Sequence, residues 1–122
     1  MSISTLTIST DLLFASRIGA EARAVDAPIR FARTAEKLDE ILAESDSIPL
    51  ALVDMACEGI DPAWAIGRIR EVHPGARVIA FFSHVDTDQM HAAQTAGAET
   101  MPRSVFVQEL PGLLRGVVAE SE

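Results

Sequence analysis

Six polar side chains in this sequence follow directly after short runs of apolar or β-branched residues. They are Thr10, Asp11, Asp54, Ser83, Arg103 and Ser104. Asp54, for example, closes the run "LALVD". A carboxylate at the end of a buried strand meets water or a cation rather than the core, so its desolvation cost is limited. Whether these residues act together depends on the elements that position them.

Strands and helices are expected to alternate along the whole chain. The sequence predicts strands at 4–9, 28–32, 48–54, 76–82 and 99–102, and helices at 12–24, 35–45, 63–73, 86–97 and 105–120. Thr34 and Asp61 are the expected N-caps of two helices. Pro111 is expected either to kink the last helix or to begin its regular part.

This alternation predicts an α/β fold with a parallel sheet, helices on both faces and right-handed crossovers. In such sheets the functional crevice lies at the carboxyl ends of the strands. All six polar side chains are therefore expected on one rim of the molecule.

The composition limits the kind of protein. The 122 residues are 48% hydrophobic, which predicts a single domain, residues 1–122, with a substantial core. The formal net charge of −8 repels phosphate backbones and anionic lipid, so neither nucleic acid nor a membrane is an expected partner. The absence of a secretory signal and of a long apolar run, together with a single cysteine, predicts a cytoplasmic protein.

Three stretches, "LALVDM", "VIAFFSHVD" and "AAQTAGAETMPRSVF", resemble the receiver domains of two-component response regulators. The resemblance extends over nearly the whole chain. It implies a flavodoxin-like fold, a three-layer, doubly wound arrangement of five βα units with strand order 2-1-3-4-5.

The resemblance also implies roles for individual residues. Asp54 matches the aspartate that accepts a phosphoryl group, and Ser83 matches the hydroxyl that bonds it. Asp11 matches one of two acids that bind Mg²⁺ together with that aspartate, whereas Thr10 stands in the place of the other. Asp11 and Asp54 are therefore expected to hold Mg²⁺ weakly or not at all, since this ion needs an octahedron of oxygen ligands but tolerates several waters and only one or two carboxylates.

The lysine that receivers carry after the fifth strand is absent. Ser104 stands most naturally in its place, with Arg103 one residue before it. If Ser104 occupies the lysine position, Arg103 is expected to point away, because neighbouring side chains on a strand face opposite sides. A shift of the register by one residue would reverse this.

These departures predict an atypical receiver, or pseudo-receiver. Such a module is not an enzyme, acts in signalling mainly through protein–protein interaction, and has reduced or lost aspartate phosphorylation. The alternative is a single-domain response regulator that accepts a phosphoryl group on Asp54 with Mg²⁺. The expected partner is a histidine kinase or a downstream effector.

By resemblance, partners or a second copy would dock on the face of the fourth helix, fifth strand and fifth helix. The apolar residues expected to form this face include Met90, Ala93, Val105, Leu110 and Leu114.

Other roles stay open for several residues. Asp11 suits a helix cap as well as a metal ligand, and Ser83 suits an ordinary loop hydroxyl. Trp64 is expected either to anchor a partner or to pack its ring within the fold. Cys57 is expected to be a small packed residue, because no neighbouring base would activate it. His84 is expected to be a solvated loop residue.

Overall fold

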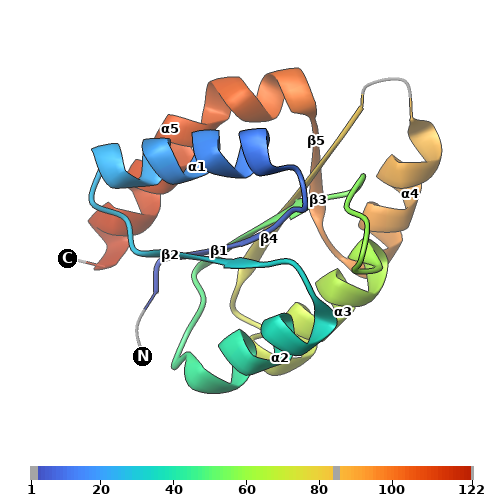
Figure 1. The fold of residues 1–122 in the computed structure, drawn as a ribbon, viewed down its shortest axis with the longest axis horizontal. Helices are drawn as coiled ribbons and strands as arrows, with labels where there is room; N and C mark the ends of the chain where they lie inside the picture. The colour runs from blue at the N-terminus through green and yellow to red at the C-terminus, as the bar shows by residue number, and fades with distance from the viewer. Residues whose placement is uncertain (1–2, 84–85, 122) are drawn as a thin grey trace.

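The computed structural model describes residues 3–83 and 86–121, and strands and helices alternate strictly along them (Figure 1). The strands are β1 (Thr5–Ile8), β2 (Ile29–Ala32), β3 (Leu50–Asp54), β4 (Arg77–Phe82) and β5 (Glu99–Pro102). The helices are α1 (Leu12–Ala24), α2 (Ala35–Glu44), α3 (Pro62–Val72), α4 (Thr87–Ala96) and α5 (Arg103–Ser121). The strands pair in parallel in the order β2-β1-β3-β4-β5, which confirms the predicted fold class.

The sheet is covered on both faces, α1 and α5 lying on one side and α2, α3 and α4 on the other (Figure 1). Alternate residues of β3 serve the two sides. Leu50 and Leu52 pack toward α1 and α5, whereas Ala51 and Val53 pack toward the other three helices. A strand buried on both faces must be apolar at every position, which is why "LALV" carries no alternation.

Local signals account for several element ends. The Thr34 hydroxyl accepts a hydrogen bond from the backbone N–H of Lys37, so Thr34 caps α2 as predicted. Asp61 caps α3, with Pro62 as the first helical residue. β3 begins at Leu50 rather than at residue 48. The preceding Pro49 has no N–H to give to a sheet that continues on both sides.

The last helix differs from the prediction at its start. α5 begins at Arg103 rather than at Val105, and it runs through Pro111 to Ser121. Pro111 therefore does not begin the regular part of the helix. The helix continues through it although proline has no N–H to donate to the backbone ladder. Arg103 is consequently a helical residue, and the alternation of a strand does not set its direction.

The predicted partner face on α4, β5 and α5 is mostly core. Ala93, Leu110 and Leu114 are buried between these elements and the sheet, and Met90 is partly buried. Val105 alone of the five residues is substantially exposed, at 40%. The prediction was wrong for the three buried residues because helical spacing identifies an apolar stripe but not whether the sheet already covers it.

Among the helices of the described residues, none combines the length and the apolar character that crossing a bilayer requires.

Gly97 offers a direct test of how α4 ends. Its φ of 102° lies in the left-handed region, and an added Cβ would lie 2.8 Å from the Cδ of Arg70. We expect Gly97→Ala to lower the free energy of unfolding by about 1 kcal/mol, measured by urea denaturation. Gly67→Ala is the matched control, because Gly67 lies in a helix with no atom near the added Cβ. This control should stabilise by up to about 1 kcal/mol. Equal effects of the two substitutions would contradict the assigned geometry.

Candidate functional site

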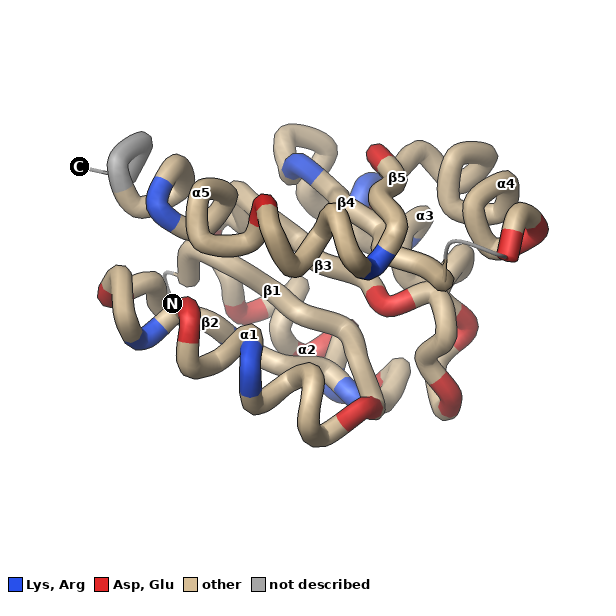
Figure 2. Tube along the Cα trace, turned by 90° about the horizontal axis from the view of Figure 1, so that it is seen from above, with Lys and Arg blue, Asp and Glu red and all other residues tan. Residues whose placement is uncertain are grey.

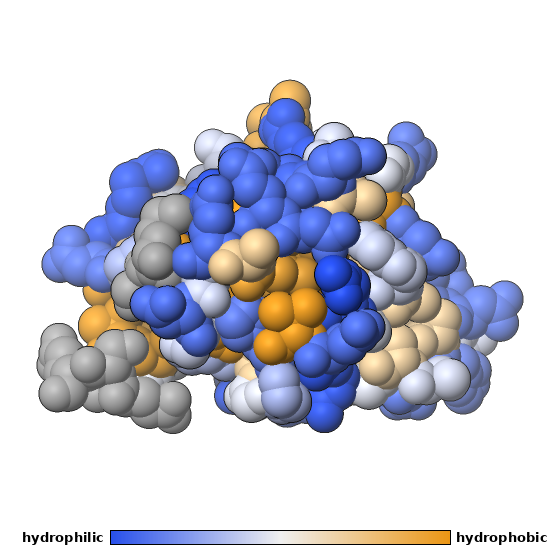
Figure 3. All heavy atoms as spheres, turned by 90° about the horizontal axis from the view of Figure 1, so that it is seen from below, coloured by the Kyte–Doolittle hydropathy of each residue, from blue (hydrophilic) through white to orange (hydrophobic). Residues whose placement is uncertain are grey.

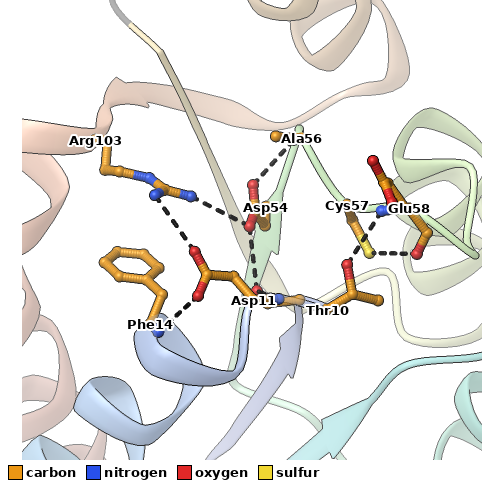
Figure 4. A network of polar contacts seen from close by, with 9 residues as sticks. Thr10, Asp11, Phe14, Asp54, Ala56, Cys57, Glu58 and Arg103 are labelled. Carbon is orange, nitrogen blue, oxygen red and sulfur yellow. Dashed lines mark hydrogen bonds and ion pairs between the residues drawn. The ribbon is translucent and has the colours of Figure 1, made fainter.

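Asp54 lies at the centre of a group of polar contacts at the carboxyl end of the sheet (Figure 4). It is the last residue of β3 and is only 3% exposed. Its Oδ2 accepts a hydrogen bond from the Ser9 hydroxyl at 3.1 Å, and its Oδ1 accepts one from the backbone N–H of Ala56 at 2.9 Å. Both carboxylate oxygens are therefore engaged by the protein itself.

The third partner of Asp54 is Arg103. Its Nη2 lies 3.3 Å from Oδ2 of Asp54, and its Nη1 lies 3.7 Å from Oδ2 of Asp11. The guanidinium also lies over the ring of Phe14, 4.4 Å from its centroid. One cation thus bridges two carboxylates that come from different strand ends (Figure 4).

Arg103 therefore points into the site. The sequence left two directions open for this side chain, and the structure has the one in which Arg103 faces the carboxylates. The reason is the early start of α5, which places Arg103 in the first helical turn.

Asp11 serves as the N-cap of α1, one of the two roles left open for it. Its Oδ1 accepts a hydrogen bond from the backbone N–H of Phe14 at 3.1 Å, and its Oδ2 faces Arg103. Thr10 turns away from the carboxylates, and its hydroxyl accepts a hydrogen bond from the N–H of Glu58 at 3.2 Å. Thr10 thereby ties the loop after β3 to the end of β1.

A pocket of about 360 Å³ opens beside Asp54 and is lined by Asp54, Ala56, Phe82, Ser83, Arg103 and Ser104. Ser83 is exposed and, among the residues that the structure describes, its hydroxyl has no hydrogen-bond partner. The pocket brings Ser83 and Asp54 together as the sequence predicts. His84 lies outside the described residues.

The observed donor set does not fit Mg²⁺. This ion needs a near-octahedral shell of oxygens, and both carboxylates expected to supply them face Arg103 instead. Thr10 stands where the resemblance implies the other acid of the Mg²⁺-binding pair, and its hydroxyl accepts a hydrogen bond from the backbone N–H of Glu58 instead. Within residues 3–83 and 86–121, no cluster of three His, Cys, Asp or Glu side chains is arranged to hold a metal.

Cys57 is buried beside this site, and its thiol donates a hydrogen bond to the carbonyl oxygen of Glu58 at 3.4 Å. Burial raises the pKa of the thiol, and the negative charge of Asp54 adds to the effect. Trp64 is 42% exposed, so its ring is neither wholly packed nor wholly free.

Ser9 was not predicted as a site residue, although it is the last residue of the predicted first strand. A signal was present. Thr5 and Thr7 of β1 alternate with Ser9, which directly follows the strand, so their hydroxyls lie on one face of the sheet. The last of them reaches the level at which Asp54 ends the neighbouring strand β3.

The sequence matches no protein-family model and no curated protein. Solved structures do match. The signal receiver domain of an HD domain-containing protein from Pseudomonas fluorescens Pf-5 superposes with a TM-score of 0.79 at 19% identity, covering 100% of both chains. A response regulator receiver domain protein from Methanospirillum hungatei JF-1 has a TM-score of 0.76 at 14% identity, over 98% of this chain and 99% of that one.

A response regulator from Burkholderia pseudomallei, solved with a phosphorylated aspartic acid, a calcium ion and citrate, also matches. Its TM-score is 0.75 at 15% identity, over 98% of this chain and 72% of that one. At these identities the likeness concerns the fold. The chain has the fold of response regulator receiver domains, as the resemblance in the sequence implies.

The bridge made by Arg103 should contribute to stability. We expect Arg103→Ala to lower the free energy of unfolding by about 1–2 kcal/mol, because it leaves the buried carboxylate of Asp54 without its cation. The side chain of Arg103 is 41% exposed, so solvent screening keeps the loss modest. Arg17→Ala is the control, since Arg17 is exposed on α1 and has no ion pair among the described residues. It should change stability by less than about 0.5 kcal/mol. A neutral effect of Arg103→Ala would mean that the bridge is absent in solution.

The Cys57 thiol should react slowly. Because burial raises its pKa, the thiolate fraction at mildly alkaline pH is smaller than that of a free cysteine. We expect the rate of alkylation by iodoacetamide to rise with pH through a midpoint above that of free cysteine. Labelling of the native protein at neutral pH as fast as that of the urea-unfolded chain would contradict this.

Proposed function

We propose that the protein is a receiver module of two-component-type signalling that acts mainly through protein–protein interaction, with reduced or lost phosphorylation of Asp54. The observation that carries this proposal is the Arg103 guanidinium between Asp54 and Asp11. The fold supports the receiver part of the proposal, and the site chemistry supports the reduced phosphorylation.

Accepting a phosphoryl group requires a carboxylate oxygen with an accessible lone pair. Oδ2 of Asp54 already accepts from Ser9 and Arg103, and Oδ1 accepts from Ala56. The side chain is 4% exposed, so little of either oxygen faces an incoming phosphorus atom. Donors on both oxygens also draw charge from the carboxylate, which makes it a weaker nucleophile.

Phosphoryl transfer also needs positive charge placed where negative charge accumulates on the transferred group. In the Burkholderia pseudomallei protein, a phosphorylated aspartic acid and a calcium ion are present in one receiver-type structure. In this chain the cation beside the aspartate is a side chain that neutralises the carboxylates themselves. Arg103 can thus neutralise Asp54 and Asp11 without a metal ion. Because the carboxylates are already neutralised, the site favours a module that signals by binding partners.

The alternative is a phosphorylation-competent response regulator, and one observation favours it. The pocket next to Asp54 already contains the Ser83 hydroxyl, and the Arg103 side chain borders solvent. Rotation of Arg103 out of the bridge would free both carboxylates. Under either hypothesis the partner class that we propose is a histidine kinase or a downstream effector.

Incubation with acetyl phosphate and excess Mg²⁺, followed by intact-mass spectrometry, distinguishes the two. We expect no phosphoryl adduct on the wild-type protein under conditions that fully modify a receiver known to be phosphorylated. Asp54→Asn is the matched control, because it keeps the size of the side chain and removes the nucleophile. A wild-type adduct that disappears in Asp54→Asn would overturn the proposal and establish the alternative.

A further inference from the structure

The largest exposure of apolar side chains occurs at the start of α1. Leu13 is 86% exposed and Leu12 is 61% exposed, more than any other large apolar side chain among the described residues. The opposite side of the molecule, over α2 and α3, is mainly hydrophilic, with an apolar area at its centre and others toward its sides (Figure 3). Since the predicted face on α4 and α5 is largely core, α1 is the better candidate for a contact surface.

Leu12 belongs to a groove between α1 and β2, the edge strand of the sheet. The groove has a volume of about 360 Å³, and Ala15, Gly19 and Phe31 contribute to its apolar lining. A Cβ at Gly19 would lie in ordinary van der Waals contact with Nη1 of Arg23, at 3.5 Å, and with the ring of Phe31, at 3.6 Å. A larger side chain would fill the space.

Two arginines border this apolar groove. Arg23 on α1 and Arg33 just beyond β2 are exposed, and neither has an ion pair within the described part of the chain. The protein as a whole has a net charge of −8, so two arginines without ion pairs beside one groove differ in sign from the charge of the whole molecule. Figure 2 shows basic segments on α1, and acidic segments both near α4 and beside α1.

The edge of β2 adds a further feature. Within the part of the chain that the structure describes, β2 pairs only with β1, so its outer edge offers unpaired backbone groups next to the groove. A peptide in the groove can therefore receive an apolar side chain, ion pairs and backbone hydrogen bonds from one continuous surface.

We propose that this groove docks a segment of a partner protein in which acidic residues flank an apolar side chain. The apolar side chain would lie against Phe31 and Ala15, and the carboxylates would pair with Arg23 and Arg33. This inference rests on the proposed role as a partner-binding module, and it names the surface and the chemistry of the partner.

Charge complementarity selects this occupant over two others. A second copy docked through the same groove by two-fold symmetry would bring arginines against arginines. A nucleic acid would gain two arginines at the groove but would meet the repulsion of a chain with net charge −8.

The test uses a fluorescein-labelled peptide in which acidic residues flank a central leucine and phenylalanine. We expect saturable binding by fluorescence anisotropy and amide chemical-shift changes confined to α1 and β2. Arg23→Ser combined with Arg33→Ser should weaken binding about tenfold, since each exposed ion pair contributes modestly. Ser16→Trp, at an exposed position of the groove lining, should block binding sterically without altering the core.

Arg17→Ser is the matched control, because it removes an exposed α1 arginine outside the groove, and it should leave binding unchanged. The inference is overturned if the peptide does not bind, if the groove variants bind as wild type, or if the shifts map to another surface. Preferential binding of a single-stranded oligonucleotide, or a dimer in sedimentation that the arginine variants dissociate, would likewise overturn it. Phosphorylation of Asp54 would contradict the proposed function while leaving this binding result intact, so the two failures can be told apart.

Discussion

A carboxylate buried at the end of a central strand must be compensated, because removing an unpaired charge from water costs far more than a single hydrogen bond returns. Asp54 is in this position, and its partners come from three separate parts of the chain. Ser9 follows β1, Ala56 lies in the loop after β3, and Arg103 begins α5. The carboxylate therefore fixes the carboxyl ends of these elements relative to one another. The contacts of Asp54 therefore stabilise the fold as well as forming the candidate site.

Arg103 can make the bridge because aromatic rings support it from below. Its guanidinium lies over Phe14, and Phe14 meets Phe81 edge-on with centroids 5.0 Å apart. Phe81 in turn stacks on Phe106 at 4.2 Å, one helical turn beyond Arg103. This cluster joins α1, β4 and α5, so displacement of the arginine would disturb the packing of both helices on that face.

The sequence was sufficient for those features that depend on local patterns. Apolar runs and caps such as Thr34 and Asp61 located the alternating elements, and the parallel arrangement placed Asp11 and Asp54 at one rim. It was insufficient where tertiary packing decides. The start of α5, two residues earlier than predicted, turned Arg103 inward. The burial of Leu110 and Leu114 depends on what the sheet covers, and the hydrogen bond from Ser9 depends on the register of β1 against β3.

The Arg103 guanidinium lies between the two carboxylates and neutralises them without a metal ion. The most direct measurement is a crystal structure of the wild-type protein grown in a large excess of Mg²⁺. We expect density for the Arg103 guanidinium between Asp54 and Asp11, with no ion bound to either carboxylate. An octahedral ion coordinated by both aspartates, with Arg103 turned out into solvent, would contradict it.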